Sequence, residues 1–109
     1  MITVQVFKNN NDIIAFELSG HANSGPYGYD LVCAAVSAVS FGAVNAIMEL
    51  CNVDLIITQG EEGGYLHVAL PKEIAKSDYV NIQLLIQSMI ISLTTIEREY
   101  SEFIIIKEK

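Results

Sequence analysis

The sequence contains two long uncharged apolar stretches, Leu31 to Met48 and Tyr79 to Ile96, and these say more about its fold than any other feature. Each is 18 residues long, just under the roughly 20 apolar residues that a membrane-spanning helix needs. Small or polar residues interrupt both stretches, namely Ser37, Ser40, Gly42 and Asn45 in the first and Asn81, Gln83, Gln87, Ser88, Ser92, Thr94 and Thr95 in the second. Since such residues suit helices packed within a protein better than helices facing lipid, we predict two long core helices and no membrane partner.

Length and charge narrow the class of protein further. A chain of 109 residues can bury a real core without disulfides, so we expect a single domain spanning residues 1–109. Hydrophobic residues make up 51% of the chain, more than a core of this size needs. The surplus predicts an apolar surface that binds a second copy of the chain, as in a homodimer. Six basic against 13 acidic residues give a net charge of -7, which disfavours direct nucleic-acid binding and favours a basic peptide or protein partner. The N-terminus, Met1 to Val4, lacks the basic segment of a secretory signal, so we expect a cytoplasmic location.

The first thirty residues predict a hairpin followed by a loop. Ile2, Val4 and Val6 alternate with more polar residues, as in a half-buried strand, and the polar cluster at 9–12 predicts a turn. A second strand follows, and its alternation predicts one buried face, formed by Ile14, Phe16 and Leu18. Residues 20–30 contain too many glycines and turn-forming residues for a regular element, so we expect a loop there.

The first helix is predicted from residue 31 to about residue 50. Asp30 stands directly before the apolar run, where a helix N-cap belongs. One row of small residues recurs every fourth position and predicts close packing against another element; it consists of Ala34, Ala38, Gly42 and Ala46. The second helix, from about Ser77 to Arg98, has one apolar stripe, which consists of Ile82, Leu85, Ile86, Met89, Leu93, Ile96 and Tyr100. Leu84 and Ile91 fall outside it, so this helix has apolar side chains left over for a second partner.

The remaining segments complete the predicted fold. Asp54 to Thr58 and Tyr65 to Leu70 flank the glycine-rich turn at 60–64 and predict a second hairpin, and Phe103 to Ile106 predicts a last short strand. The element order is then ββαββαβ. We therefore predict an α+β fold, a two-layer sandwich in which two main helices pack on a mixed β-sheet.

The two cysteines, Cys33 and Cys51, are predicted to be at opposite ends of the first helix. At about 1.5 Å per residue their sulfurs lie about 27 Å apart, whereas a disulfide needs Cα atoms within about 7 Å. With His21 and His67 they form no pair at the spacing of metal ligands, so we expect neither a metal nor another cofactor. His67 falls on the less buried face of its strand and is assigned no role.

Cys33 and His21 together predict nucleophilic chemistry. Cys33 lies in the first turn of its helix, where the helix dipole favours a thiolate, whereas Cys51 lies at the disfavoured end. His21 precedes a loop long enough to bring its imidazole over the start of that helix. A cysteine beside a histidine forms a nucleophile and its base, although by spacing alone such a cysteine is more often a buried apolar residue.

The segment around these two residues resembles the signature of a known family. Gly20-His21-Ala22, Gly28, Asp30 and Val32-Cys33-Ala34-Ala35-Val36-Ser37 are similar, without a gap, to the motif of the bacterial ribosomal-processing cysteine proteases called Prp or YsxB-like. The resemblance extends to length, acidity and element order. It implies a small homodimeric protease that removes the N-terminal extension of a large-subunit ribosomal protein, L twenty-seven, during ribosome maturation.

The resemblance also implies roles for single residues. Cys33 would be the nucleophile and His21 the general base. Asp30 would cap the helix or orient the imidazole, and Ser37 would donate a hydrogen bond to the sulfur or substrate, or bond back to the carbonyl of Cys33. Gly20 would turn the chain sharply out of its strand. The loop that follows is expected to close over the substrate. Gly25 and Gly28 would be its hinges, and Tyr27 and Tyr29 would form walls of the substrate pocket.

A second function class stays open from the sequence alone. The chain would then be a dimeric binding module or chaperone for a basic ribosomal protein, with Cys33 a structural residue. Replacing Cys33 by Ala separates the two hypotheses, because a protease would lose cleavage and keep peptide binding.

Overall fold

The computed structural model describes residues 1–21, 30–60 and 64–109. Its elements follow the predicted order, namely β1 (Ile2–Asn9), β2 (Asp12–Ser19), α1 (Leu31–Leu50), β3 (Ile56–Gln59), β4 (Tyr65–Ala69), α2 (Lys76–Glu99) and β5 (Ile104–Glu108). The predicted helices agree with α1 and α2 to within one residue at each end. β3 and β5 each begin and end one or two residues later than predicted.

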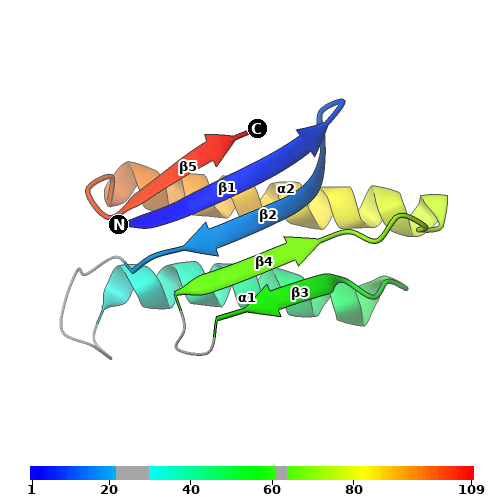
Figure 1. The fold of residues 1–109 in the computed structure, drawn as a ribbon, viewed down its shortest axis with the longest axis horizontal. Coiled ribbons are helices and arrows are strands. Elements are labelled where there is room, and N and C mark those ends of the chain that lie inside the picture. The colour runs from blue at the N-terminus through cyan, green and yellow to red at the C-terminus, as the bar shows by residue number, and fades with distance from the viewer. Residues whose placement is uncertain (22–29, 61–63) are drawn as a thin grey trace.

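The strands form one five-stranded mixed sheet in the order β3-β4-β2-β1-β5. Three neighbouring pairs are antiparallel, and β1 pairs with β5 in parallel. Figure 1 shows both helices on the same face of this sheet, with α1 behind β3 and β4 and α2 behind the other half. The predicted two-layer α+β sandwich is confirmed.

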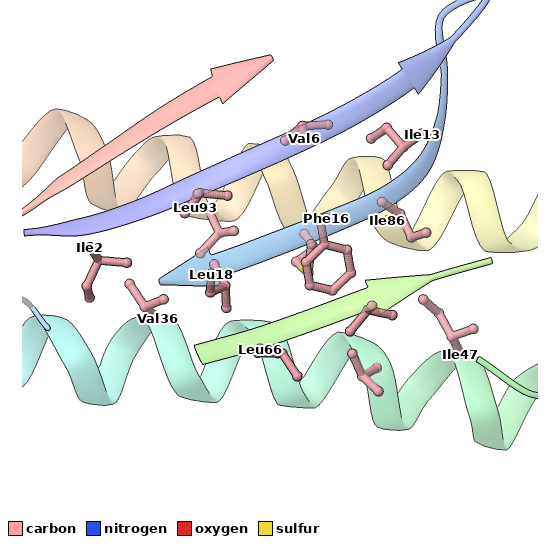
Figure 2. Packing of buried hydrophobic residues seen from close by; sticks show 14 of the residues in the cluster. Ile2, Val6, Ile13, Phe16, Leu18, Val36, Ile47, Leu66, Ile86 and Leu93 are labelled. Carbon is pink, nitrogen blue, oxygen red and sulfur yellow. The ribbon is translucent and has the colours of Figure 1, made fainter. Parts of the chain in front are cut away.

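The core lies between the sheet and the two helices. Figure 2 shows side chains from both layers meeting there, among them Val36, Ile47, Phe16, Leu66 and Leu93. Gln83 of α2 is a polar side chain buried in this layer. Its Nε2 donates to the carbonyl oxygen of Ile13 at 2.7 Å, and its Oε1 accepts from the backbone N–H of Ile13 at 2.9 Å. A buried amide paired in this way fixes α2 against the start of β2.

The predicted inward face of the second strand is wrong at its first position. Ile13 is 2% exposed and Ile14 is 41% exposed. The register shifts between Phe7 and Lys8, so that Phe7 pairs with Ala15 but Lys8 pairs with Ile13. This bulge gives β2 one extra residue, Ile14, and exchanges the faces of the residues before it.

The small-residue ridge of the first helix does not pack closely against the described part of the chain, contrary to prediction. Ala34, Ala38 and Gly42 are exposed, and a Cβ atom at Gly42 would have nothing within 4 Å. α1 instead buries a different row, which consists of Val32, Val36, Ser40, Val44 and Ile47. Valine and isoleucine remove more apolar surface from water than alanine and glycine, so the larger side chains decide which face turns inward.

The second helix also departs from prediction at its end. Tyr100, expected on the buried stripe, is exposed, whereas Leu84 and Ile91 are exposed as expected. By length and composition alone both α1 and α2 are apolar enough to cross a membrane. In this fold each of them covers half of the sheet (Figure 1).

Candidate active site

Cys33 lies in the first turn of α1, and Asp30 fixes its backbone. Asp30 is the N-cap residue, with φ -78° and ψ 102°, and its Oδ1 accepts a hydrogen bond from the N–H of Cys33 at 3.0 Å. The carbonyl oxygen of Asp30 accepts from the N–H of Ala34, also at 3.0 Å. Asp30 therefore has the predicted cap position. The backbone N–H of Cys33 is already hydrogen-bonded in this cap.

His21 directly follows the last pairing between β2 and β4. There the N–H of Gly20 donates to the carbonyl of Gly64 at 2.8 Å, and the Met1 amino group donates to the carbonyl of His21 at 2.7 Å. Gly20 has φ 90°, a left-handed conformation that favours glycine, and a Cβ atom there would collide with the carbonyl oxygen of Met1. The chain thus turns sharply at Gly20 and presents His21 at the end of the sheet.

Gly64 lies directly against the imidazole of His21. It has φ 75°, and a Cβ atom at this position would lie 2.6 Å from Nε2 and 3.2 Å from Cε1 of His21. Any side chain at Gly64 would therefore occupy the space of the imidazole ring. From the sequence, Gly64 is predicted only as part of a hairpin turn; its contact with His21 could not be predicted, because nothing in the local pattern links residues 43 positions apart.

A pocket of about 280 Å³ joins these residues. Its lining combines α1, the ends of β2 and β3, and the starts of β1 and β4; it consists of Ile2, Leu18, Gly20, His21, Cys33, Val36, Ser37, Phe41, Gln59, Gly60, Gly64, Tyr65 and Leu66. The structure thus brings four predicted residues, Gly20, His21, Cys33 and Ser37, to one cavity. Most of the other side chains in the lining are apolar, the polar ones being His21, Ser37, Gln59 and Tyr65, so the cavity suits an apolar group beside the thiol.

Ser37 lies one turn after Cys33 on α1, and its side chain is exposed. Among the described residues its hydroxyl makes no hydrogen bond, so the bond back to the carbonyl of Cys33 is not formed. The neighbouring Ser40 makes such a bond, from Oγ to the carbonyl of Val36 at 2.7 Å. The hydroxyl of Ser37 therefore remains available to a molecule in the pocket.

Tyr65 reaches from the pocket to the open face of the sheet. Its hydroxyl donates to Oε1 of Glu17 at 2.6 Å. This hydrogen bond, with smaller contributions from burial and from the charge of Glu17, raises the pKa of the Tyr65 hydroxyl. Tyr65 therefore stays a neutral donor, with its hydroxyl directed to Glu17.

Four predicted site residues, Gly25, Tyr27, Gly28 and Tyr29, lie outside the described residues, as does most of the loop expected to close over the substrate. His67, assigned no role, is half-buried on β4 and contacts Phe7, with ring centroids 6.1 Å apart. Within the described ranges 1–21, 30–60 and 64–109, no three acidic, cysteine or histidine side chains are grouped as metal ligands.

Comparison with known proteins gives one consistent family. The sequence model of the family described as cysteine protease Prp matches residues 1–105. The ribosomal processing cysteine protease Prp of Bacillus subtilis is 45% identical over 94 residues, which cover 86% of this chain and 84% of that protein. Its counterpart in Staphylococcus aureus strain Mu50 is 41% identical over 106 residues, which cover 94% of this chain and 93% of that protein.

Solved structures agree with the sequence comparison. The essential ribosomal processing protease Prp from S. aureus in complex with a covalently linked product peptide superposes with a TM-score of 0.91 at 39% identity, covering all of both chains. The same protease in complex with a substrate peptide gives a TM-score of 0.83 at 38% identity, again covering all of both chains.

Proposed function

Because the chain belongs to the Prp family of cysteine proteases and is itself a cysteine protease, we propose that Cys33 is its nucleophile and His21 its general base. The observation that carries this assignment is that both side chains line one pocket, at the start of α1. A helix N-terminus favours the thiolate form of a cysteine, and an adjacent imidazole can accept its proton. Cys51 lies at the other end of the same helix, outside this pocket.

In the proposed reaction, Sγ of Cys33 attacks the carbonyl carbon of the scissile peptide bond while His21 takes the thiol proton. The carbon–nitrogen bond of the tetrahedral intermediate then breaks, and His21 gives this proton to the leaving amine. The other half of the substrate stays on Cys33 as a thioester. Water attacks the thioester carbonyl as His21 removes one of its protons. The carbon–sulfur bond then breaks, the second product leaves with a new carboxyl group, and the proton on His21 passes to Sγ and restores the thiol.

The proposed substrate is the N-terminal extension of the large-subunit ribosomal protein L twenty-seven, removed during ribosome maturation in the cytoplasm. Three observations support it. The relatives are named ribosomal processing proteases, and the net charge of -7 attracts a basic ribosomal protein more than a nucleic acid. The exposed hydroxyl of Ser37 and the apolar wall around Phe41 suit a bound peptide.

The test is cleavage of a synthetic peptide spanning the N-terminal extension of B. subtilis L twenty-seven, followed by mass spectrometry. The wild-type protein should give two products. Cys33→Ala should bind the peptide and leave it uncut, and His21→Ala should lower kcat by at least about 100-fold. The matched control is Cys51→Ala, which should cleave at the wild-type rate. Cleavage that survives Cys33→Ala would contradict the assignment.

We also propose that the protein is a homodimer, with α2 as its interface. Three apolar side chains on the outer face of this helix support the proposal, because Val80, Leu84 and Ile91 are 60%, 69% and 70% exposed. Burying such a stripe against a second copy removes it from water. Sedimentation equilibrium at micromolar concentration should show a dimer for the wild type and a monomer for Leu84→Glu. A wild-type monomer would overturn the proposal.

A further inference from the structure

The two edges of the sheet differ in how their outward backbone groups are treated. At the β5 edge, the N–H of Ile106 points away from β1 and donates to Oε2 of Glu97 on α2 at 2.7 Å. Lys107 and Glu108 add charge to the same strand. A side chain that occupies an outward N–H, together with charge, prevents another strand from pairing there. The β5 edge is therefore closed to a further strand.

The β3 edge lacks this protection in the part of the chain that the structure describes. Its four residues, Ile56 to Gln59, carry no charge, and Ile56 is exposed on the edge. The N–H of Gly60 donates to the carbonyl of Tyr65, so this pair is a hydrogen-bonded one. Since hydrogen-bonded and non-bonded pairs alternate in an antiparallel ladder, the backbone groups of Ile57 and Gln59 point outward.

This open edge leads into the pocket that holds Cys33. Gln59, the last residue of β3, and Gly60 line the same cavity as Cys33 and His21. Gln59 pairs with Leu66, whose side chain is buried toward the helices, so the Gln59 side chain lies on that same face. A strand added beside β3 would turn every second side chain toward α1.

We propose that β3 is a docking strand for the substrate, which binds as an extended segment hydrogen-bonded to the outward N–H and C=O groups of Ile57 and Gln59. The segment continues past Gly60 and delivers the scissile bond to Cys33. This inference rests on the proposed function, because it names how the substrate of that same site is held. Binding through the main chain supplies affinity, and the pocket supplies selectivity for the side chain that enters it.

A peptide fits this edge better than a second copy of the chain. A four-residue strand offers two outward residues, which suits a short extended segment, whereas stable dimers bury on the order of 800 Å² per partner. The edge also ends at the thiol, where a cleavable chain has to pass. The apolar stripe of α2 lies on a different element and serves the dimer proposed above.

The decisive experiment is an N-methyl scan of the B. subtilis L twenty-seven peptide, one backbone nitrogen at a time, with KM and kcat measured for each. Pairing with β3 predicts that only every second position on one side of the cut is sensitive, with KM raised about tenfold by the loss of one hydrogen bond. Uniform or absent sensitivity would overturn the docking strand while leaving the protease assignment intact. An unmodified peptide that is neither bound nor cut would overturn both.

A pair of variants tests the protein side. Gln59→Ala removes the side chain and keeps the N–H, whereas Gln59→Pro also removes the outward N–H, which makes no bond to β4. KM should rise about tenfold from the alanine to the proline variant, while the rate of Cys33 alkylation stays equal in the two. Equal KM values would contradict the proposal.

Amide exchange in Cys33→Ala gives a readout that does not depend on catalysis. Adding the peptide should slow exchange at Ile57 and Gln59 at least about tenfold and leave the outward amides of β5, at Ile104 and Glu108, unchanged. Protection of Ile57 that instead grows with protein concentration, without peptide, would assign the edge to a second copy and overturn the proposal.

Discussion

The two cysteines at the ends of α1 have the same side chain in opposite surroundings. Cys33, half-buried in the first turn, lines the pocket, and the Asp30 carboxylate accepts from its N–H. Cys51 is the C-cap residue, its N–H donates to the carbonyl of Ile47 at 2.9 Å, and it is 7% exposed. Burial, and secondly the charge of Asp78, raises the pKa of the Cys51 thiol.

The difference shows that place on the helix, more than residue type, decides what a thiol can do. The helix dipole favours negative charge at the N-terminus and disfavours it at the C-terminus. At Cys51 the dipole, burial and Asp78 all favour the neutral thiol, which packs as a small apolar group. At Cys33 the dipole favours the thiolate, and the pocket gives a substrate access to it.

The two thiols should differ most clearly in the rate at which they are alkylated. With limiting iodoacetamide at pH 7, Cys33 should react faster than Cys51 by a factor on the order of 100 or more. The thiolate is the reactive form, and Cys51, which is buried as a neutral thiol, reacts only after local opening and loss of its proton. Peptide mapping after timed quenching measures both rates in one sample. In concentrated urea the two rates should converge, and comparable rates in the folded protein would break the comparison.

The next effect tests whether Gly64 fixes the position of the His21 imidazole in the pocket that Cys33 also lines. Gly64→Ala puts a Cβ atom into the space of the His21 ring, so we expect kcat to fall about 10- to 100-fold and the pH of half-maximal Cys33 alkylation to rise. A merely structural role would lower the melting temperature without moving that pH.

The matched control is Gly42→Ala, at an exposed helical position with open space around the added Cβ atom. It should leave cleavage unchanged and raise the free energy of unfolding by about 0.5–1 kcal/mol, since alanine is the better helix former. Equal loss of activity in both alanine variants would show that Gly64 has no special contact with His21.

A smaller effect separates the two roles considered for Asp30. Asn is as good an N-cap as Asp. Asp30→Asn should therefore leave the free energy of unfolding unchanged and keep activity within about twofold of the wild type. Asp30→Ala loses the bond to the N–H of Cys33 and should lower the free energy of unfolding by about 1 kcal/mol, measured by urea denaturation. A large loss of activity in Asp30→Asn at unchanged stability would instead assign Asp30 to orienting His21.

The smallest effect concerns the stability of the Cys51 end of the helix at alkaline pH. Because folding raises the pKa of Cys51, the unfolded chain loses this proton first, so the stabilisation is complete below the unfolded pKa and is lost as pH rises through the folded one. Above about pH 9 the free energy of unfolding should therefore fall.

The effect of Cys51 is isolated in a Cys33→Ala background by urea titrations from pH 7 to 10. Adding Cys51→Ala should flatten the alkaline decline, by at most about 1 kcal/mol. Burial and the hydrogen bond to Asp12 also raise the pKa of Tyr79. Tyr79→Phe, titrated in the same way, therefore separates the contribution of Tyr79 to the alkaline decline from that of Cys51. Identical pH profiles with and without Cys51 would contradict the raised pKa.

Local signals in the sequence were sufficient for the elements and the start of the site. Apolar periodicity placed both helices, and Asp30 before an apolar run marked where α1 begins, because a cap depends on residues within one turn. The motif around His21 and Cys33 identified the pair that lines the pocket. Alternation failed at Ile14, since the bulge opposite Phe7 and Lys8 depends on the partner strand.

Other features depend on contacts between segments far apart in the chain, so they are visible only once the chain is folded. The sheet order brings Gly64 against His21 and the end of β3 to the thiol, although Gly64 and Gln59 belong to another hairpin. The same packing turns the small-residue ridge of α1 outward. The order of the elements and the candidate site residues could be predicted before any fold was known, because periodicity, helix caps and motifs depend on neighbours along the chain. The pairing of strands and the burial of faces depend on which contacts remove the most apolar surface from water across the whole molecule.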